Sequence, residues 1–383
     1  MKRRLAIVSP FPRAPDAHIG GIEGVSACLA AEIARTSDFD VHVVSPTDIN
    51  GPATEIRGNI TIHWVKSPVI LPPVLSYWTI LRSRLHKELE RIAPDITHFQ
   101  GIGGWTIGYS RPYILTIHGI AERDILFSTK PAKAIRKTII RSVEQYARKR
   151  TKNFVIINPY VKKVLSDSIR GRCWSIENPV NRIFFSKHRS DFANTIVFAG
   201  RITPIKNVLQ LLRAFRIALR HNPALHLVIA GPTGDAQYYQ SCRQFAVKHQ
   251  LENHVRYTGP LTPVELAELL SKAGCLVLPS LQENAPLVIS EAMAVGTPIV
   301  ASDVGGIRYM IQNNVNGFLC DPLFEEQIAA SLTRAMSDRS VNYSIGAHNR
   351  ELALETYHPS QVAQKTIAAY FAILKQIPNN PQI

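Results

Sequence analysis

The sequence predicts an α/β protein of two domains, each built around a parallel sheet. Three observations lead to this fold class: the length of 383 residues, the alternation of short apolar runs with helical patterns along the chain, and the near-continuous hydrophobicity of several runs. A chain of this length exceeds one compact core and suits two domains. Continuous apolar runs are typical of parallel strands buried on both faces, and alternating strands and helices are typical of sheets covered by helices.

Strands are expected at the short apolar runs. In the first half of the chain these lie at residues 5–10, 41–46, 60–65, 95–100, 113–119, 153–158 and 173–178. In the second half they lie at residues 195–200, 225–231, 255–259, 275–280, 297–302 and 317–320. Helical spacing occupies gaps between them, as in residues 22–35, 208–220 and 263–272, the last with a proline in its first turn.

The domain boundary is expected in the segment 179–194, which is polar, charged and without clear periodicity. We therefore predict two Rossmann-like doubly wound domains, residues 1–181 and 182–358, that face each other across a cleft. The last helical pattern has no strand after it. Residues 359–383 are accordingly expected to form a C-terminal helix that packs back on the N-terminal domain.

The composition excludes several classes of protein. With 45% hydrophobic and 19% charged residues the chain resembles an ordinary soluble protein. Its five cysteines form no C-x-x-C pair, which argues against a disulfide framework or zinc knuckle and for a reducing compartment. The sequence has no signal-peptide core and no apolar run of roughly 20 residues, so we expect a cytoplasmic protein. A net charge of +15 predicts attraction to anions, whether nucleic acid, acidic membrane or phosphorylated small molecules.

Ligands of doubly wound sheets meet the carboxyl ends of the strands. This rule selects a short set of positions: Gly20–Gly21, His118–Gly119, Gly200–Arg201, Gly231, Gly259, Ser280–Glu283 and Gly305–Gly306. The glycine pair in "HIGGIEG" lets backbone amides approach an anion at a helix N-terminus, although a plain glycine turn is an equal alternative. The pair is not the G-x-G-x-x-G of dinucleotide-binding proteins, which weakens an oxidoreductase interpretation.

Two cations follow the strand at 195–200. Arg201 and Lys206 lie in the turn that opens the next helix, where charge-assisted hydrogen bonds and the helix dipole favour a diphosphate. The alternative, two solvated surface cations, is less favoured because both lie at the carboxyl end of a strand.

Two carboxylates occur in "SLQENAPLVISEAMAVGTP", residues 280–298. A helix is expected to begin at Pro286 and to end at Gly296. Glu291 then lies inside this apolar helix and should have a hydrogen-bonding partner, while Glu283 lies before it, near the free amides of residues 284–288. A metal site is not expected, because no histidine, cysteine or cluster of oxygen ligands accompanies them.

These motifs together resemble the retaining, nucleotide-sugar-dependent glycosyltransferases of the GT-B fold, the "group 1" class or glycosyltransferase family 4. The likeness rests on "GRITPIKN" and, about 80 residues later, "SLQENAPLVISEAMAVGTPIVASDVGG", whose Glu283 and Glu291 match the E-x7-E motif. It extends to "GGIEGVSACLAAEIARTSDFDVHVVSP", "TIHG", "ENPVN", "VIAGPTGD" and "VRYTGPLTPVELAELLSKAGCLVLPS". In this order the motifs are specific and cover nearly the whole chain.

The resemblance implies an acceptor-binding N-terminal domain and a donor-binding C-terminal domain. It assigns Arg201 and Lys206 to the donor diphosphate, Glu283 to the donor sugar, Glu291 to the ribose and His118 to a sugar hydroxyl. Arg201, Lys206, Glu283 and His118 form the implied catalytic set, with no cofactor and no metal. The implied donor-binding set is Gly20, Gly21, Gly200, Arg201, Lys206, Gly231, Glu283, Asn284, Ala285, Leu287, Val288 and Glu291. One departure is Tyr309, where many members carry an acidic residue.

The implied reaction moves a sugar from a nucleotide diphosphate, expected to be UDP, to a saccharide or lipid-linked acceptor in polysaccharide or glycolipid synthesis. Acceptor choice is expected in the loops 51–59, 71–78 and 101–110. Alternatives are a GT-B sugar phosphorylase or nucleotide-sugar epimerase and, from another class, a nucleic-acid-binding protein. The nucleic-acid-binding alternative lacks a known nucleic-acid module, and aromatic residues are not interleaved with the basic run as stacking platforms require.

The basic charge is concentrated in two segments with helical apolar spacing. Residues 130–152 carry one acid, Glu144, against Lys130, Lys133, Arg136, Lys137, Arg141, Arg148, Lys149, Arg150 and Lys152. Residues 75–91 place Tyr77, Trp78 and Ile80 beside further cations. These helices either bury their apolar stripe in the domain core or dock the N-terminal domain on an anionic membrane leaflet, at the inner face of the membrane.

Overall fold

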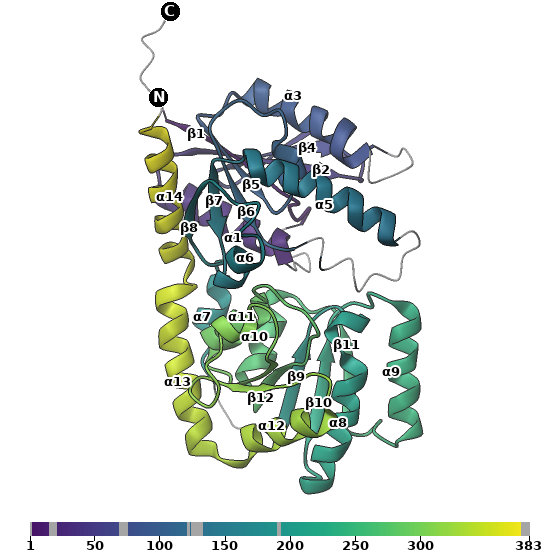
Figure 1. Ribbon diagram of the computed structural model, residues 1–383. Coiled ribbons are helices and arrows are strands. Elements are labelled where there is room, and N and C mark those ends of the chain that lie inside the picture. Colours follow the sequence, from purple (N-terminus) through teal and green to yellow (C-terminus); the bar gives the residue numbers. More distant parts are fainter. Residues whose placement is uncertain are drawn as a thin grey trace, which may run out of the picture. The chain divides into compact units, whose positions relative to one another are not determined.

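The computed structural model describes residues 2–14, 21–68, 76–120, 123, 133–189 and 193–376. The chain divides into two compact units (Figure 1). The N-terminal unit combines the chain up to Pro179 with the C-terminal segment from Pro359, and the C-terminal unit contains Val180–His358. Each unit has its own sheet and its own helices.

The N-terminal unit contains an eight-stranded sheet in the order β3-β4-β2-β1-β5-β6-β7-β8. Its strands are β1 (Arg4–Val8), β2 (Asp40–Thr47), β3 (Thr54–Arg57), β4 (Ile60–Lys66), β5 (Ile96–Gln100), β6 (Tyr113–Ile117), β7 (Asn153–Ile156) and β8 (Arg172–Ser175). Its helical elements are α1 (Gly21–Thr36), the π-helical turn η1 (Tyr77–Leu81), α3 (Arg82–Ile92), the 3-10 turn η2 (Gly103–Thr106), α5 (Lys133–Arg150), α6 (Pro159–Val164) and α14 (Pro359–Leu374).

All strand pairs of this sheet are parallel except β3 and β4. The edge strand β3 corrects our expectation of an irregular loop at 51–59. Its sequence, TEIR, is short and polar at three of its four positions, so it carries no pattern that separates an exposed edge strand from a loop. The segment 101–110, expected to be an acceptor-binding loop, contains the 3-10 turn η2, and all four residues of this turn are buried.

Helix α14 packs against α1 in the N-terminal unit, as predicted for the C-terminal helix. The hydroxyl of Tyr370 on α14 lies 2.6 Å from Nδ1 of His98 on β5. The ring of Phe39 meets those of Tyr370 and Phe371 at centroid distances of 5.9 and 5.6 Å. The helix is thus fixed by a buried polar contact and by aromatic packing.

The C-terminal unit contains a fully parallel six-stranded sheet in the order β11-β10-β9-β12-β13-β14. Its strands are β9 (Thr195–Ala199), β10 (His226–Ala230), β11 (Val255–Gly259), β12 (Cys275–Leu278), β13 (Ile299–Ser302) and β14 (Phe318–Cys320). Its helical elements are α7 (Arg182–Ser186), the 3-10 turn η4 (Pro204–Lys206), α8 (Val208–His221), α9 (Ala236–Lys248), α10 (Pro263–Ser271), α11 (Leu287–Val295), the 3-10 turn η5 (Ile307–Tyr309), α12 (Glu325–Ser337) and α13 (Arg339–Thr356).

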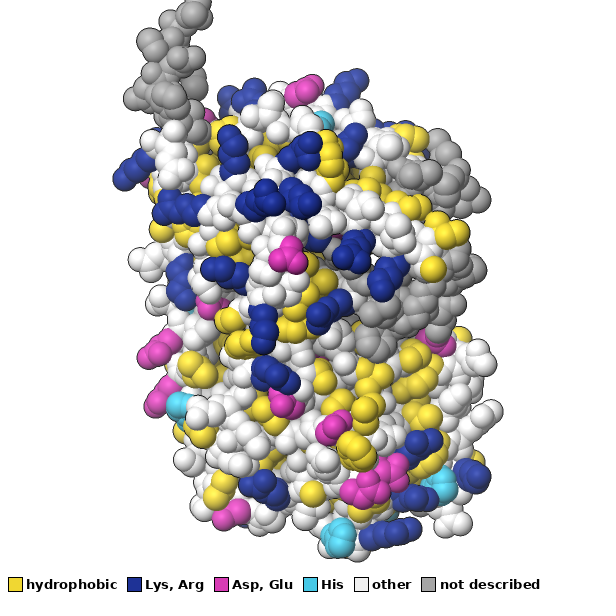
Figure 2. Space-filling view, viewed as in Figure 1, with side chains coloured by type: hydrophobic (Ala, Val, Ile, Leu, Met, Phe, Trp, Pro, Cys, Tyr) yellow, Lys and Arg dark blue, Asp and Glu magenta, His cyan; other side chains and the backbone are white. Residues whose placement is uncertain are grey.

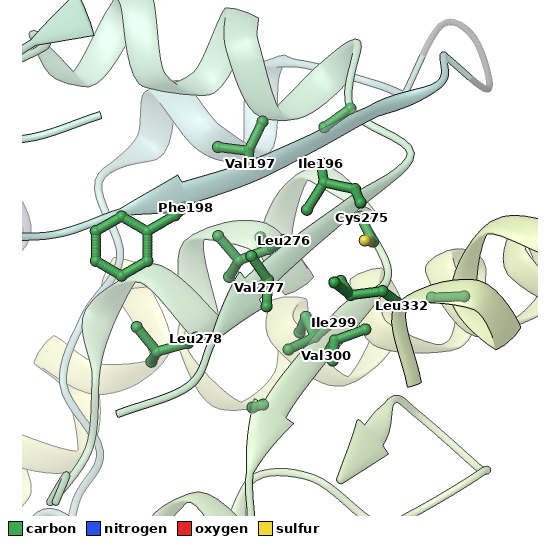
Figure 3. Packing of buried hydrophobic residues seen from close by; sticks show 14 of the residues in the cluster. Ile196, Val197, Phe198, Cys275, Leu276, Val277, Leu278, Ile299, Val300 and Leu332 are labelled. Carbon is green, nitrogen blue, oxygen red and sulfur yellow. The ribbon is translucent and has the colours of Figure 1, made fainter. Parts of the chain in front are cut away.

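Helices form two groups around this sheet: α8 packs against α9 and α12, whereas α11 packs against α7, α10 and α13. The central strands β9, β12 and β13 are almost entirely buried, and Figure 3 shows their apolar side chains packed together with Leu332 of α12. Continuous apolar strands are buried on both faces in this arrangement, as predicted. The predicted fold class is therefore confirmed, while the cleft between the two units stays a prediction.

Candidate active site

The C-terminal sheet has one topological switch point, between β9 and β12. From β9 the chain continues to β10 on one side, and β12 continues to β13 on the other. Such a reversal leaves a crevice at the carboxyl ends of the two central strands, where doubly wound proteins bind their ligands. The residues that follow these two strands, from Gly200 and from Pro279, therefore form the candidate site.

Lys206 and Glu283 meet at this switch point. The Lys206 ammonium donates a hydrogen bond to Oε1 of Glu283, and the two side chains are 24% and 10% exposed. The hydroxyl of the buried Ser280 donates to the same oxygen at 2.7 Å. Two donors thus hold a largely buried carboxylate in one orientation, which is stronger fixation than a solvent-exposed ion pair gives.

Backbone contacts fix the loop that carries Glu283. The amide of Leu281 donates to the carbonyl of Ile205 in η4 at 2.8 Å, and the amide of Gly306 donates to the carbonyl of Glu283 at 3.0 Å. Gly305 has a φ of +53°, and a Cβ atom there would overlap the Glu283 carbonyl oxygen. Both η4 and the loop after β13 therefore support this carboxylate.

One glycine, Gly231, permits close backbone approach where β9 and β10 end. Gly231 has a φ of +138°, and a Cβ atom there would overlap the carbonyl oxygen of Gly200. Gly200 itself has room for a Cβ atom, with the Phe198 ring at 3.5 Å as its nearest neighbour. The predicted positions Gly200 and Gly231 are thus adjacent, but only Gly231 requires glycine for steric reasons.

Arg201 is exposed and lies against the loop after β10, where Gly234 leaves room for it. A Cβ atom at Gly234 would lie 2.6 Å from Cδ of Arg201. Lys206 instead lies against Glu283. The two predicted diphosphate ligands follow the same strand, β9, but contact different loops: Arg201 the loop after β10 and Lys206 the loop after β12.

Helix α11 begins beside Glu283 without a side-chain cap. Its N-cap is Pro286, so among the described residues no side chain caps the amides of Leu287 and Val288, whereas the amide of Ile289 donates to the Pro286 carbonyl at 3.1 Å. Asn284 is 9% exposed, and its Oδ1 atom has no hydrogen-bond partner within the described residues. Ala285, Leu287 and Val288 are half-buried at this helix entrance. The helix start thus offers donors and a positive dipole end to an anionic or polar ligand.

Glu291 lies on the half-exposed stripe of α11 together with Leu287 and Val288. It lies inside the apolar helix expected from the sequence, whose buried residues are Ile289, Ser290, Ala292, Met293, Ala294 and Val295. The hydrogen-bonding partner expected for Glu291 does not occur in the described part of the chain. Burial raises the pKa of Glu291 to about 7.

Of the predicted residues in the N-terminal unit, His118 follows β6 and Gly21 opens α1. Nε2 of His118 lies 2.5 Å from Oε1 of Gln100. Burial lowers the pKa of His118 to about 4, and a hydrogen bond with Asn178 opposes that shift. Gly21 has a φ of +57°, which favours glycine, whereas Gly20 lies outside the described residues.

A cavity of about 770 Å³ opens at the other end of the C-terminal sheet. It is lined by the amino-terminal parts of β9, β10 and β11 and by residues of α9 and α10, and it includes none of the predicted site residues. We place the candidate site at the carboxyl ends instead, because the oriented polar groups converge there. No group of three or more metal-ligating side chains occurs among the residues that the structure describes.

Sequence reasoning missed three supporting residues. Ser280 and Gly305 occurred in the set of strand-end positions but received no role, and Gln100 was not considered. The signal for Gln100 was available, since it is the last residue of the predicted strand 95–100. No local signal indicated that Ser280 binds Glu283 rather than solvent.

The fold and the candidate site define a doubly wound protein with polar groups converging at the switch point of its C-terminal sheet. The family model "Glycosyl transferases group 1" matches residues 180–352, and the model "Glycosyltransferase Family 4" matches residues 19–182. Together these two models span both units. The chain belongs to the group 1 glycosyl transferases, and the predicted family is confirmed.

Curated relatives match over part of their length. An uncharacterized glycosyltransferase of Methanocaldococcus jannaschii is 35% identical over 183 residues, covering 47% of this chain and 45% of the relative. A D-inositol 3-phosphate glycosyltransferase of Streptomyces griseus is 35% identical over 144 residues, covering 36% of this chain and 30% of the relative. The chain thus matches less than half the length of these two relatives.

Solved structures match over nearly the whole chain. Sucrose-phosphate synthase from Thermosynechococcus elongatus has a TM-score of 0.83 at 18% identity and covers 98% of this chain and 100% of its own. Anabaena HepE in complex with UDP and glucose has a TM-score of 0.74 at 16% identity, with coverages of 97% and 100%. At these identities the likeness establishes the fold, which is GT-B.

Proposed function

We propose that this protein is a retaining glycosyltransferase that moves a sugar from a UDP-linked donor to a saccharide or lipid-linked acceptor. The observation that carries the proposal is the convergence of Lys206, Glu283 and the free start of α11 at the switch point of the C-terminal sheet. The solved structure of HepE contains UDP and glucose, which supports the choice of donor class. The family supports the reaction class.

The cations would act on the donor diphosphate. Lys206 is held in place by its ion pair with Glu283, so its charge is fixed at the switch point. A diphosphate that binds beside it gains charge-assisted hydrogen bonds from Lys206, from Arg201 and from the amides of α11. These donors stabilise the charge that develops on the departing phosphate without a metal ion or a cofactor.

The two glutamates would bind hydroxyl groups. Glu283, with one oxygen already occupied by Lys206 and Ser280, has its second oxygen to accept from a donor-sugar hydroxyl. Glu291, without a described partner, would accept from the ribose hydroxyls. A hydrogen bond to the ionised form lowers a pKa, so ribose binding would oppose the effect of burial on Glu291.

In the transfer step the bond from the sugar's anomeric carbon to the phosphate oxygen breaks on the face where the bond to the acceptor oxygen forms. The acceptor hydroxyl gives its proton to the leaving phosphate, so the step needs no dedicated base and the anomeric configuration is retained. His118 would hold a sugar hydroxyl during this step, and Gly20 and Gly21 would leave space beneath the phosphates.

Acceptor access at an anionic membrane surface is a further part of the proposal. On the face shown in Figure 2, Lys and Arg side chains gather over the N-terminal unit with few Asp or Glu among them. The helix α5 exposes Arg141, Lys149 and Arg150. Two apolar side chains beside them are also exposed, Ile135 to 65% and Tyr146 to 45%. No helix among the described residues is long and apolar enough to span a membrane.

Two residues of the basic segments pack within the N-terminal unit. Arg148 is buried and donates to the hydroxyl of Ser168 at 3.0 Å, so it cannot reach a membrane. In the segment 75–91, the half-buried Tyr77 packs against the buried Trp105 with ring centroids at 5.4 Å and ring planes tilted by 39°, so its own unit partly covers this ring. Lys130 and residues 69–75 lie outside the described residues.

Lys206→Ala tests the function directly. We expect the rate of UDP release in the presence of acceptor, measured across a panel of UDP-sugars, to fall at least 100-fold, because one charge-assisted contact in the transition state is worth about 3 kcal/mol. Lys187→Ala is the matched control, since it breaks another Lys–Glu pair, that with Glu268 at 2.7 Å, in the same unit. Equal rates for both variants would contradict the assignment.

The same assay separates the neighbouring reactions. Epimerised sugar formed from donor without acceptor would indicate an epimerase, and sugar phosphate formed on addition of inorganic phosphate would indicate a phosphorylase. The proposal expects neither product. Retention of anomeric configuration is read from the product by NMR.

A further inference from the structure

A chain of buried polar side chains leads from helix α14 to His118, entirely within the N-terminal unit. The Tyr370 hydroxyl lies 2.6 Å from Nδ1 of His98, and Nε2 of His98 lies 3.3 Å from Nε2 of Gln100. Oε1 of Gln100 then lies 2.5 Å from Nε2 of His118. All four side chains are thereby linked by hydrogen-bond distances.

Strand geometry explains why these side chains meet. His98 and Gln100 are two residues apart on β5 and therefore point to the same face of the sheet. On the neighbouring β6, Thr116 pairs in register with Gln100. The Thr116 hydroxyl lies 2.6 Å from Nε2 of His98. Tyr370 on α14 closes the row, and its side chain is fully buried.

The orientation of the Gln100 amide gives the chain a direction. Its carbonyl oxygen faces His118, so it accepts the proton on Nε2 of that ring. Its amide nitrogen then faces Nε2 of His98 and donates to it, as the Thr116 hydroxyl can also do. The remaining ring proton of His98 is on Nδ1, from which it is donated to the Tyr370 hydroxyl.

The donor–acceptor order at one end of this series fixes the order at the other end, because each histidine carries a single ring proton. His98 is 1% exposed, and burial lowers its pKa to about 3. The pKa of His118 is lowered to about 4 for the same reason. A neutral imidazole must place its one proton on one nitrogen, so the partner of either nitrogen decides the tautomer.

We propose that Gln100, His98 and Tyr370 are positioning residues that hold His118 in its Nε2–H tautomer, so that Nδ1 accepts a hydrogen bond from a hydroxyl of the bound sugar. The tautomer follows from contacts within the N-terminal unit. The acceptance of a sugar hydroxyl rests on the proposed function.

The surroundings of His118 agree with a fixed ring. A Cβ atom on Gly101 would lie 3.5 Å from Cδ2 of His118 and 2.8 Å from Cδ1 of Ile22, so Gly101 leaves space that the ring and the start of α1 share. Asn178 also contacts His118, but an asparagine amide can donate or accept by turning over. Asn178 therefore does not select the tautomer, whereas Gln100 is constrained at both ends.

Tyr370→Phe tests this hydrogen-bonded series at the end that is farthest from His118. Without the hydroxyl, His98 should move its proton to Nε2 and donate it to Thr116, which deprives the Gln100 nitrogen of its acceptor. The amide can then turn, and the Nδ1–H tautomer of His118 should become populated. We would measure this by long-range 1H–15N correlation NMR on the full-length protein with labelled histidine, assigning His118 with the His118→Gln variant.

Tyr109→Phe is the matched control. It also removes one tyrosine hydroxyl, bonded to Thr97 at 2.6 Å in the same unit, but Thr97 points to the opposite face of β5 from His98. We expect this variant to leave the tautomer unchanged. Gln100→Glu, which offers only acceptors, should preserve the Nε2–H tautomer of His118 and raise its pKa, whereas Gln100→Leu should lose that tautomer even if Tyr370→Phe fails to fold.

The activity readout tests the second half of the inference. Tyr370→Phe should lower kcat/KM for transfer roughly tenfold, the worth of one hydrogen bond, and Tyr109→Phe should not. The hydrogen-bonded series from Tyr370 to His118 would be overturned if His118 is in its Nδ1–H tautomer in the wild-type protein, or if its tautomer is unchanged in both Tyr370→Phe and Gln100→Leu. If the tautomer of His118 shifts but the transfer rate does not change, the contact with the sugar is overturned. If the Nε2–H tautomer is held in a protein that transfers no sugar, only the proposed function is overturned.

Discussion

At the scale of single residues, Glu283 and Glu291 differ although they share one motif. Glu283 has two donors on one oxygen, the Lys206 ammonium and the Ser280 hydroxyl. Glu291 has no described partner, and burial raises its pKa from 4.5 to about 7. The first carboxylate is therefore fixed by side chains of its own unit, whereas the second has no such fixation among the described residues.

The raised pKa of Glu291 predicts a pH-dependent stability. Between pH values of about 4.5 and 7 the native state binds more protons at this site than the unfolded state, so the free energy of unfolding falls as the pH rises through this window. Glu291→Gln removes the penalty. We expect this variant to be more stable than the wild type by about 1–2 kcal/mol at pH 8, after allowance for partial exposure, and by far less at pH 5.

Urea unfolding of both proteins at the two pH values measures this difference. Ser280→Ala serves as a comparison, because it lies at the same site but removes no titratable group. A constant difference between Glu291→Gln and wild type at both pH values would show that Glu291 does not titrate in this range.

At the scale of elements, the apolar runs predicted the buried strands well because parallel strands in this fold are apolar on both faces. The edge strand β3 escaped prediction, since three of the four residues in TEIR are polar and none of them is buried. Long-range contacts could not be predicted: Lys206 and Glu283 are 77 residues apart, and His98 and Tyr370 are 272 apart. Sequence patterns predict where each strand ends. Which strand ends lie next to each other depends on the order of the strands in the folded sheet, which these patterns do not contain.

A substitution in the loop after β13 should affect stability and donor binding as strongly as a substitution at Glu283, which this loop supports. Gly305→Ala places a Cβ atom on the Glu283 carbonyl oxygen in addition to the strain of a left-handed backbone. We expect a loss of about 3 kcal/mol in the free energy of unfolding and strongly reduced donor binding. Chemical denaturation and calorimetric titration with UDP measure these two effects.

Gly58→Ala isolates the backbone part of this effect. Gly58 has a similar φ of +58°, but a Cβ atom there meets no other atom within 4 Å. Gly58→Ala should lower the free energy of unfolding by about 1 kcal/mol and leave donor binding unchanged. If the two variants were equally stable, the packing of Gly305 against Glu283 would be unimportant.

At the scale of the whole molecule, the charge of +15 is spread unevenly, with a basic surface on the N-terminal unit that includes α5. An anionic leaflet attracts each such cation by about 1 kcal/mol. The triple variant Arg141→Ala, Lys149→Ala, Arg150→Ala should therefore lower binding to phosphatidylserine-containing vesicles by more than tenfold. Co-sedimentation at fixed ionic strength measures this binding.

A triple variant of equal charge change in the C-terminal unit provides the control: Arg220→Ala, Arg256→Ala, Lys272→Ala, all at exposed positions. It should bind vesicles nearly as well as the wild type if α5 carries the docking surface. Binding that does not depend on the phosphatidylserine content would exclude this surface as a membrane contact.

The central claim is that a nucleotide diphosphate binds at the carboxyl ends of β9 and β12 beside Lys206. Isothermal titration of UDP into the wild type, Lys206→Ala and Lys187→Ala, at one salt concentration and without added metal, tests it most directly. The account predicts binding to the wild type, a Kd raised roughly 10- to 100-fold by Lys206→Ala, and no change with Lys187→Ala. Equal affinity of all three proteins for UDP, or no binding to the wild type, would contradict it.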